Sequence, residues 1–387
     1  MFSLLMKSLI NNSKNVLKIK NVQRKTFCSQ TTTISVSPKR QVGIWLAAMS
    51  GMTVGAVILG GVTRLTESGL SMTDWHLFKE RPPFNEEEWT KEFAKYQMFP
   101  EYKHKISENG SMSLSEFKFI WWMEYGHRMW GRAIGVAYAV PAMYFYYKGY
   151  FNKSMKFKVL VFGGLIGFQG LLGWYMVQSG LQETKSETAV PRVSQYRLAA
   201  HLGSAIALYS LFLWNAFSHL STPIKVADFP KLKMIRGMTH GVKLFVVLTA
   251  ISGAFVAGLD AGLTYNNWPK MADRWIPTDL LTLSPKWVNI FENATTVQFD
   301  HRWLGQITGT LILALWIVCQ KNKAFLPRRV QLACHALGLA AIAQITLGIT
   351  TLVHYVPMPL AATHQTGSLV LLSTALWLSH SLRRLPK

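Results

Sequence analysis

Eight segments of the chain are almost continuously apolar, and polar or charged residues are concentrated between them. The segments are residues 42–62, 118–147, 159–178, 195–217, 242–259, 300–320, 330–353 and 358–380. Each is close to the roughly 20 apolar residues that an α-helix needs to cross the hydrocarbon core of a bilayer. The pattern therefore predicts an all-α polytopic membrane protein with eight transmembrane helices.

Several sequence motifs of the first half of the chain are repeated in the second half. The run His127–Gly131, followed by Gly135, is repeated 174 residues later as His301–Gly305, followed by Gly309. The residues after the first span of each half match at an offset of 193, and Gln169 matches Gln344 at an offset of 175. Because each half contains four predicted spans, we expect two tandem pseudo-symmetric four-helix bundles. Their predicted bounds are 41–220 and 237–387, joined by a linker over 221–236.

Composition and charge agree with a membrane protein. Half of the residues are hydrophobic, 16% are charged and the formal net charge is +22. Basic residues fill the loops at 148–158, 218–241 and 321–329, whereas acidic residues fill the loops on the opposite side. The positive-inside rule then puts both termini on the side that is not translocated. No basic run is interleaved with aromatic residues, so we expect no nucleic-acid partner.

Residues 1–40 contain eight basic residues and no acidic one, and Glu67 is the first acidic residue of the chain. This composition is typical of a mitochondrial transit peptide, and the alternative is a disordered basic tail. We therefore expect a multi-pass protein of the mitochondrial inner membrane with both termini in the matrix. Cys28, Cys319 and Cys334 have no CxxC spacing, which indicates packing residues rather than a zinc site or a disulfide framework.

Four of the eleven histidines lie near the starts of the second and fourth spans of the two halves: His127, His201, His301 and His364. The second and fourth helices of a bundle run parallel, so His127 can face His201 and His301 can face His364. Two imidazoles opposed across a glycine-lined gap are the ligand set of a six-coordinate heme. The alternatives are interhelical hydrogen bonds and a zinc or copper site, which would not require the glycines.

Charged side chains accompany these histidines. Arg128 and Arg302 directly follow two of them and would meet a heme propionate or an interfacial phosphate, unless they only extend to water. Glu124 lies one helical turn before His127, where a carboxylate in an apolar segment indicates function. Its counterpart at the 174-residue offset is Gln298. The asymmetry predicts chemistry in the first half and cofactor binding in the second, with a Glu124–Arg128 salt bridge as the simpler alternative.

Taken together, the segments 60–71, 124–128, 299–303 and 363–365 resemble the heme A synthase family in its mitochondrial form, over about residues 42–381. The resemblance implies an inner-membrane enzyme that oxidises a methyl group of heme O to a formyl group, giving heme A for cytochrome c oxidase. It implies His301 and His364 as axial ligands of a heme b cofactor, His127 and His201 as ligands or positioners of the substrate heme, and Glu124 as the candidate catalytic group. It leaves open whether Glu124 stabilises positive charge or takes a proton from water.

The charge bias of the loops puts the four histidines, and so the heme sites, towards the intermembrane space. With the resemblance we also expect a homo-oligomer among inner-membrane lipids, and heme O synthase and a ferredoxin-type electron donor as partners. Bacterial members carry cysteine pairs in the outer loops, and none of the three cysteines here lies in such a loop. Two other functions stay open. A di-heme b-type electron carrier or quinol oxidoreductase would use the four histidines but not Glu124, and a heme transporter would bind heme without altering it.

Overall fold

The computed structural model describes residues 37–76, 80–181 and 192–384, and within them the chain is all-helical. Each apolar segment of the sequence lies on one long helix. These helices are α2 (Pro38–Leu65), α5 (Leu114–Tyr147), α6 (Lys153–Gly180), α7 (Gln195–Leu220), α8 (Leu232–Gly258), α10 (Ala294–Lys321), α11 (Arg328–Val353) and α12 (Met358–Ser381). Residues 1–36 of the predicted transit peptide, with Cys28, lie outside the described residues.

Shorter helices fill the connections. They are α3 (Glu86–Gln97), α4 (Pro100–Asn109), α9 (Asn289–Glu292) and the 3₁₀ turns η1 (Ala261–Leu263), η2 (Lys286–Val288) and η3 (Lys323–Phe325). Asn85 and Ser113 cap the starts of α3 and α5 through their side chains, which satisfies backbone N–H groups that a helix leaves unpaired. Helix α8 begins at Leu232, so the last five residues of the predicted 221–236 linker are helical.

Among the described residues, six helices are long and apolar enough to cross a membrane: α2, α6, α7, α8, α10 and α11. The prediction of eight spans is therefore not confirmed, although the protein is a helical membrane protein. The two remaining long helices carry polar site residues, which lower their hydropathy. Glu124, Arg128 and Arg132 lie on α5, and His364 and Gln365 lie on α12.

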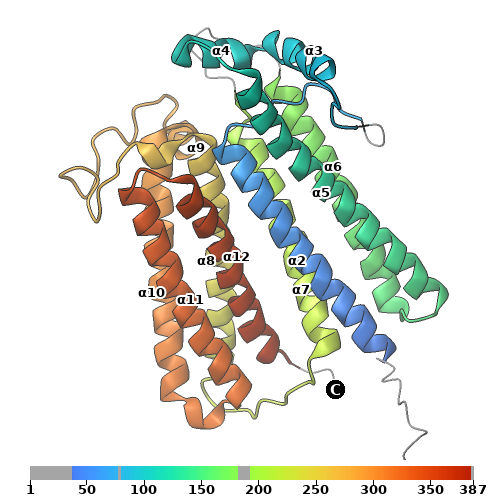
Figure 1. The fold of residues 1–387 in the computed structure, drawn as a ribbon. Coiled ribbons are helices and arrows are strands. Elements are labelled where there is room, and N and C mark those ends of the chain that lie inside the picture. The colour runs from blue at the N-terminus through green and yellow to red at the C-terminus, as the bar shows by residue number, and fades with distance from the viewer. Residues whose placement is uncertain (1–36, 77–79, 182–191, 385–387) are drawn as a thin grey trace, which may run out of the picture. The chain divides into compact units, whose positions relative to one another are not determined.

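The long helices form two neighbouring groups (Figure 1), with α2, α5, α6 and α7 in one and α8, α10, α11 and α12 in the other. Helix α7 packs against α8 and α12 and so joins the groups. One apolar core lies among α7, α8 and α10–α12, and it includes Ile235, Leu315 and the free thiols of Cys319 and Cys334, which pack as predicted. A second core around Leu46, Phe162 and Phe212 lies among α2, α5, α6 and α7.

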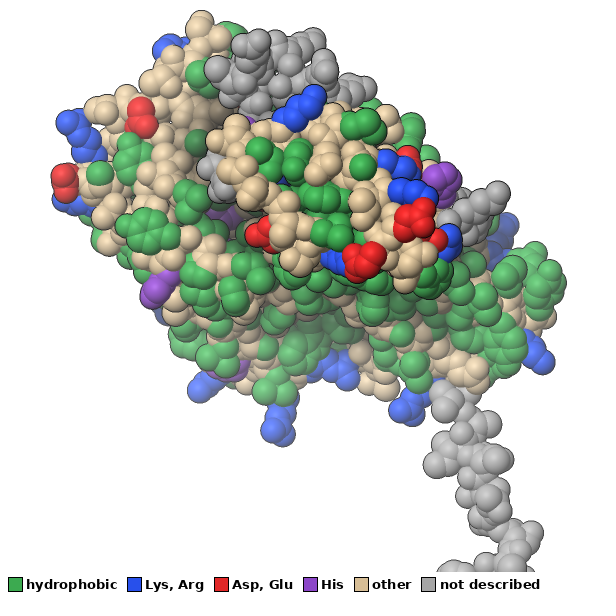
Figure 2. Space-filling model, turned by 45° about the horizontal axis from the view of Figure 1, so that its top comes forward, with side chains coloured by type: hydrophobic (Ala, Val, Ile, Leu, Met, Phe, Trp, Pro, Cys, Tyr) green, Lys and Arg blue, Asp and Glu red, His purple; other side chains and the backbone are tan. Residues whose placement is uncertain are grey.

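The outside of the molecule is banded. Figure 2 shows acidic side chains near the end that carries α3 and α4, a broad zone of hydrophobic side chains below it, and Lys and Arg along the opposite rim. Large apolar side chains such as Leu160, Leu339 and Ile342 are more than half exposed. Exposed apolar area of this extent indicates contact with lipid rather than with water.

Candidate functional site

One large cavity lies between the helices and is lined by residues of both helix groups. Its volume is about 1850 Å³, well above the roughly 300–1000 Å³ of an ordinary small-molecule pocket. All seven residues predicted from the sequence line this cavity: Glu124, Arg128, Arg302, His127, His201, His301 and His364. The structure thus brings together side chains that are up to 240 positions apart in the chain.

The histidines of the second half face each other. His301 on α10 and His364 on α12 have ring centroids 6.4 Å apart, with ring planes at 90°. This separation leaves room for one metal atom bound by a nitrogen of each ring at about 2 Å. No group of three or more His, Cys, Asp or Glu side chains that could hold a metal ion occurs within residues 37–76, 80–181 and 192–384. A pair of axial imidazoles is the protein ligand set of a bis-histidine heme, so these residues fit that group.

The histidines of the first half lie on α5 and α7. The Nδ1 atoms of His127 and His201 are buried, and neither has a hydrogen-bond partner among the described residues. In the second half, by contrast, Nδ1 of His301 lies 2.7 Å from Oγ of Ser252, and Nδ1 of His364 lies 3.2 Å from Nε2 of Gln344. The Nδ1 atoms of the second pair of rings therefore have side-chain neighbours, and those of the first pair have none among the described residues.

Each of the four rings lies against a glycine of a neighbouring helix. A Cβ atom on Gly60 would lie 2.9 Å from Cε1 of His127, and one on Gly348 would lie 2.8 Å from Cε1 of His364. The corresponding distances are 3.2 Å for Gly253 and His301 and 3.6 Å for Gly173 and His201. Any side chain at Gly60 or Gly348 would therefore push the imidazole away from its present place.

The glycines that the sequence predicts beside the hemes are different ones, on the same helices as His127 and His301. Gly131, Gly135 and Gly305 line the cavity, and an added Cβ at each would meet no atom within 4 Å. A Cβ on Gly309 would instead meet the side chain of Ile345. The four glycines that seat the rings were missed, although their spacing was a signal, because Gly60 and Gly253 are 193 residues apart and Gly173 and Gly348 are 175 apart.

Glu124 is almost fully buried, with 2% of its surface exposed, and both of its carboxylate oxygens accept hydrogen bonds. Oε2 accepts from the backbone N–H of Met72 and from the hydroxyl of Ser71, both at 2.8 Å. Oε1 accepts from Nη2 of Arg128 at 2.7 Å, which is the salt bridge that the sequence offered as an alternative. Since every partner is a donor, the surroundings suit an ionised carboxylate.

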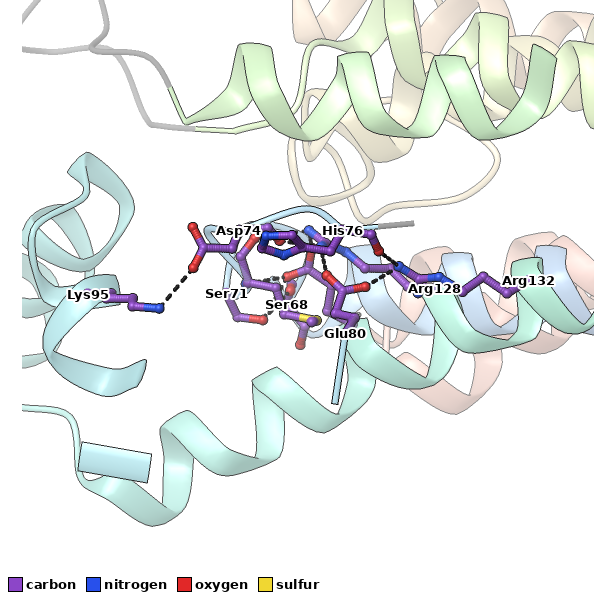
Figure 3. Close-up of polar contacts among 10 residues, drawn as sticks. Ser68, Ser71, Asp74, His76, Glu80, Lys95, Arg128 and Arg132 are labelled. Atoms are coloured by element: carbon purple, nitrogen blue, oxygen red, sulfur yellow. Dashed lines mark hydrogen bonds and ion pairs between the residues drawn. The ribbon is translucent and has the colours of Figure 1, made fainter. Parts of the chain in front are cut away.

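Arg128 is hydrogen-bonded to residues of the connection between α2 and α3. It donates to the carbonyls of Met72 and Asp74 at 2.9 Å and to Oε1 of Glu80 at 3.0 Å. Arg132, one turn further along α5, also donates to Glu80, and Figure 3 shows both guanidinium groups converging on that carboxylate. The sequence did not single out Glu80, because a lone carboxylate in a loop carries no pattern.

The equivalent end of the second half is neutral at the matching position. Gln298 donates to the carbonyl of Tyr265 at 2.9 Å, and its Oε1 has no partner among the described residues. Arg302 donates to the carbonyls of Asn267, Pro269 and Lys270 and lies 5.2 Å from the ring of Trp268. Its buried Nη1 has no partner among the described residues, so one donor stays available for an anionic group in the cavity.

A second buried carboxylate lines the cavity from α4. Glu101 lies 3.3 Å from Nζ of Lys105, which also donates to the carbonyl of Glu67 at 2.8 Å. Burial raises the pKa of Glu101 to about 7, an effect that the neighbouring Lys105 ammonium only partly offsets. No pattern in the sequence separates Glu101 from the other acidic residues of this loop.

Comparison with known proteins gives a consistent result. The family model COX15-CtaA, described as cytochrome oxidase assembly protein, matches residues 43–376. The chain is 58% identical to the mouse protein named Heme A synthase COX15 over 354 residues, which cover 91% of this chain and 84% of that protein. It is 41% identical to a Heme A synthase of Nitrosospira multiformis, over 92% of this chain and 97% of that protein. The chain therefore belongs to the COX15-CtaA family of cytochrome oxidase assembly proteins.

Proposed function

We propose that this protein is a heme A synthase, an oxidoreductase that converts a methyl group of heme O into the formyl group of heme A. The names of its relatives support this activity. The observation that carries the proposal is the cavity with two histidine pairs, only one of which has a buried carboxylate one helical turn away. A di-heme electron carrier would have no use for that difference.

His301 and His364 hold a heme b in this proposal, and His127 and His201 hold the substrate heme O. The 6.4 Å between the ring centroids of His301 and His364 leaves room for one heme iron, and a cavity of about 1850 Å³ supports two heme groups. When bound, the heme b supplies the redox chemistry. Arg302 meets a heme propionate through its remaining donor, whereas Arg128 is bonded to Met72, Asp74 and Glu80 and is less available for that task.

Glu124 is the catalytic group of this proposal, and its task is to stabilise positive charge that develops at the methyl carbon. Three fixed donors hold the carboxylate, so it needs no reorganisation when charge appears nearby. Accepting a proton from an attacking water would instead neutralise the negative charge to which these three donors, the Arg128 guanidinium among them, are hydrogen-bonded. The fixed surroundings of the carboxylate therefore support the electrostatic task.

All eight long helices span the mitochondrial inner membrane in this proposal, as two tandem four-helix bundles with both termini in the matrix. The polar residues of α5 and α12 line the internal cavity, so these helices can cross the bilayer without exposing them to lipid. The acidic end of the molecule, with the heme sites, then faces the intermembrane space. Heme O synthase, a ferredoxin-type donor and a homo-oligomeric state stay predictions from the family resemblance.

The test compares single alanine variants of the four histidines in a strain that makes heme O but lacks its own heme A synthase. His301→Ala and His364→Ala should lose the bound heme b. His127→Ala and His201→Ala should keep most of the heme b and stop heme A formation. Equal loss of heme b from all four variants would contradict the division between the two sites. Heme A formation by all four would contradict the proposed activity of this cavity.

A further inference from the structure

One imidazole ring of the second half, that of His301, is fixed through an N–H group at Nδ1. Ser252 donates its hydroxyl hydrogen to the carbonyl of Thr249 at 2.8 Å. The same Oγ lies 2.7 Å from Nδ1 of His301, so it accepts from an Nδ1–H group. A proton on Nδ1 leaves the lone pair of Nε2 available for a metal. Ser252 thus sets both the tautomer and the direction of the His301 ring.

The second ring of this half lies beside an amide NH₂ group, which is a donor and so does not hold a proton on Nδ1 as Ser252 does. Nε2 of Gln344 lies 3.2 Å from Nδ1 of His364 and donates to the carbonyl of the same residue at 2.9 Å. Gly367 makes room for this arrangement, because a Cβ at that position would clash with the amide oxygen of Gln344. The glutamine therefore reaches the ring only because the residue three positions after His364 has no side chain.

The first half contains the same glutamine, but its stronger contact is with a serine instead of a histidine ring. Gln169 donates to Oγ of Ser204 at 2.6 Å and to the carbonyl of His201 at 3.3 Å. Ser204 stands three positions after His201, where the second half has Gly367. At the 193-residue offset, Leu59 takes the place of Ser252. Neither Nδ1 of His127 nor Nδ1 of His201 has a partner among the described residues.

We propose that Ser252 is a positioning residue that holds His301 in ligand geometry, whereas Leu59 at the matching position leaves His127 able to turn. The second site then retains its heme and the first site exchanges it. This inference rests on the proposed assignment of cofactor heme to the second half. A site that must release its product cannot hold both axial ligands rigidly, because a preoriented ligand lowers the free-energy cost of binding and so slows release.

The test uses the purified full-length protein loaded with heme b, and it measures the rate at which heme passes to an excess of apomyoglobin. Ser252→Ala should raise the release rate from the second site roughly 10- to 100-fold, the usual effect of removing a partner of a metal ligand. It should also shift the reduction potential of the bound heme, which a purely structural role would leave unchanged. Ser252→Thr keeps a hydroxyl and should restore both quantities.

The reciprocal change tests the other half of the inference. Leu59→Ser gives His127 the partner that His301 has, and it should slow the release of added heme b from the first site. Unchanged release and potential in Ser252→Ala, or unchanged release in Leu59→Ser, would overturn the inference. A wild-type protein that binds no heme b would instead overturn the proposed cofactor site, so the two failures are distinguishable.

Discussion

Replacing Glu124 with Gln changes one oxygen of a buried carboxylate into an NH₂ group, and every neighbour of that carboxylate is a donor. If the NH₂ group turns towards Met72, the backbone N–H of Met72 loses its acceptor. If it turns towards Arg128, the guanidinium group loses one of four acceptors and keeps Glu80 and two carbonyls. The second orientation is the less costly. A buried donor left without a partner costs about 1–3 kcal/mol.

That cost is smaller than the roughly 5–15 kcal/mol by which folded proteins are usually stable. Glu124→Gln should therefore fold and retain the heme b of the second half. Catalysis should fail, because removing one preorganised electrostatic group costs roughly 2.7–4 kcal/mol in the transition state. The rate of heme A formation should fall about 10²- to 10³-fold.

The assay measures heme A, heme O and partly oxidised intermediates in a strain that lacks its own heme A synthase. Glu87→Gln is the matched control, because Glu87 is an exposed residue of α3 that pairs only with Lys91 among the described residues. The control should form heme A at the wild-type rate. Normal heme A levels in Glu124→Gln, at normal protein abundance, would refute the catalytic role and leave Glu124 as a structural salt-bridge partner.

Three further predictions concern stability, packing and topology. Burial raises the pKa of Glu101 from 4.5 to about 7. The wild type should therefore lose up to about 3 kcal/mol of stability relative to Glu101→Gln as the pH rises from 4.5 to 7. A difference in melting temperature between the two proteins in detergent that stays constant with pH would contradict this. Gly348→Ala should displace His364 and lower the heme b content, whereas Gly126→Ala, with no atom within 4 Å of its Cβ, should not; equal heme contents would contradict the seating of the ring. Ser111→Cys should be labelled from the intermembrane space and Ser154→Cys from the matrix, and the reverse pattern would invert the proposed topology.

Much of the architecture was predictable because it depends on patterns that a sequence carries directly. Apolar runs located all eight long helices, and repeat offsets paired His127 with His301. The amphipathic helices α3 and α4 were not predicted, because they lie in an acidic outer loop without a long apolar run. The number of membrane spans was also not settled by the pattern, since polar residues that line an internal cavity lower the hydropathy of α5 and α12.

The contacts around the histidines were not predictable from spacing. Ser252 and Gln344 act through their side-chain orientations, which depend on how two helices pack and on small neighbours such as Gly367. Gln169 and Gln344 occupy matching positions and both donate to the carbonyl of a histidine, yet their second contacts differ, with Ser204 in one case and the His364 ring in the other. Glu80 reaches Arg128 from a loop whose path only the folded chain defines.

The most direct test of the central claim is the chromatographic identification of hemes extracted from the purified wild-type protein. A heme A synthase with a retained cofactor and an exchangeable substrate site should yield heme b together with heme O, heme A or both. Heme b alone, in a host that makes heme O, would contradict the claim and favour a di-heme electron carrier.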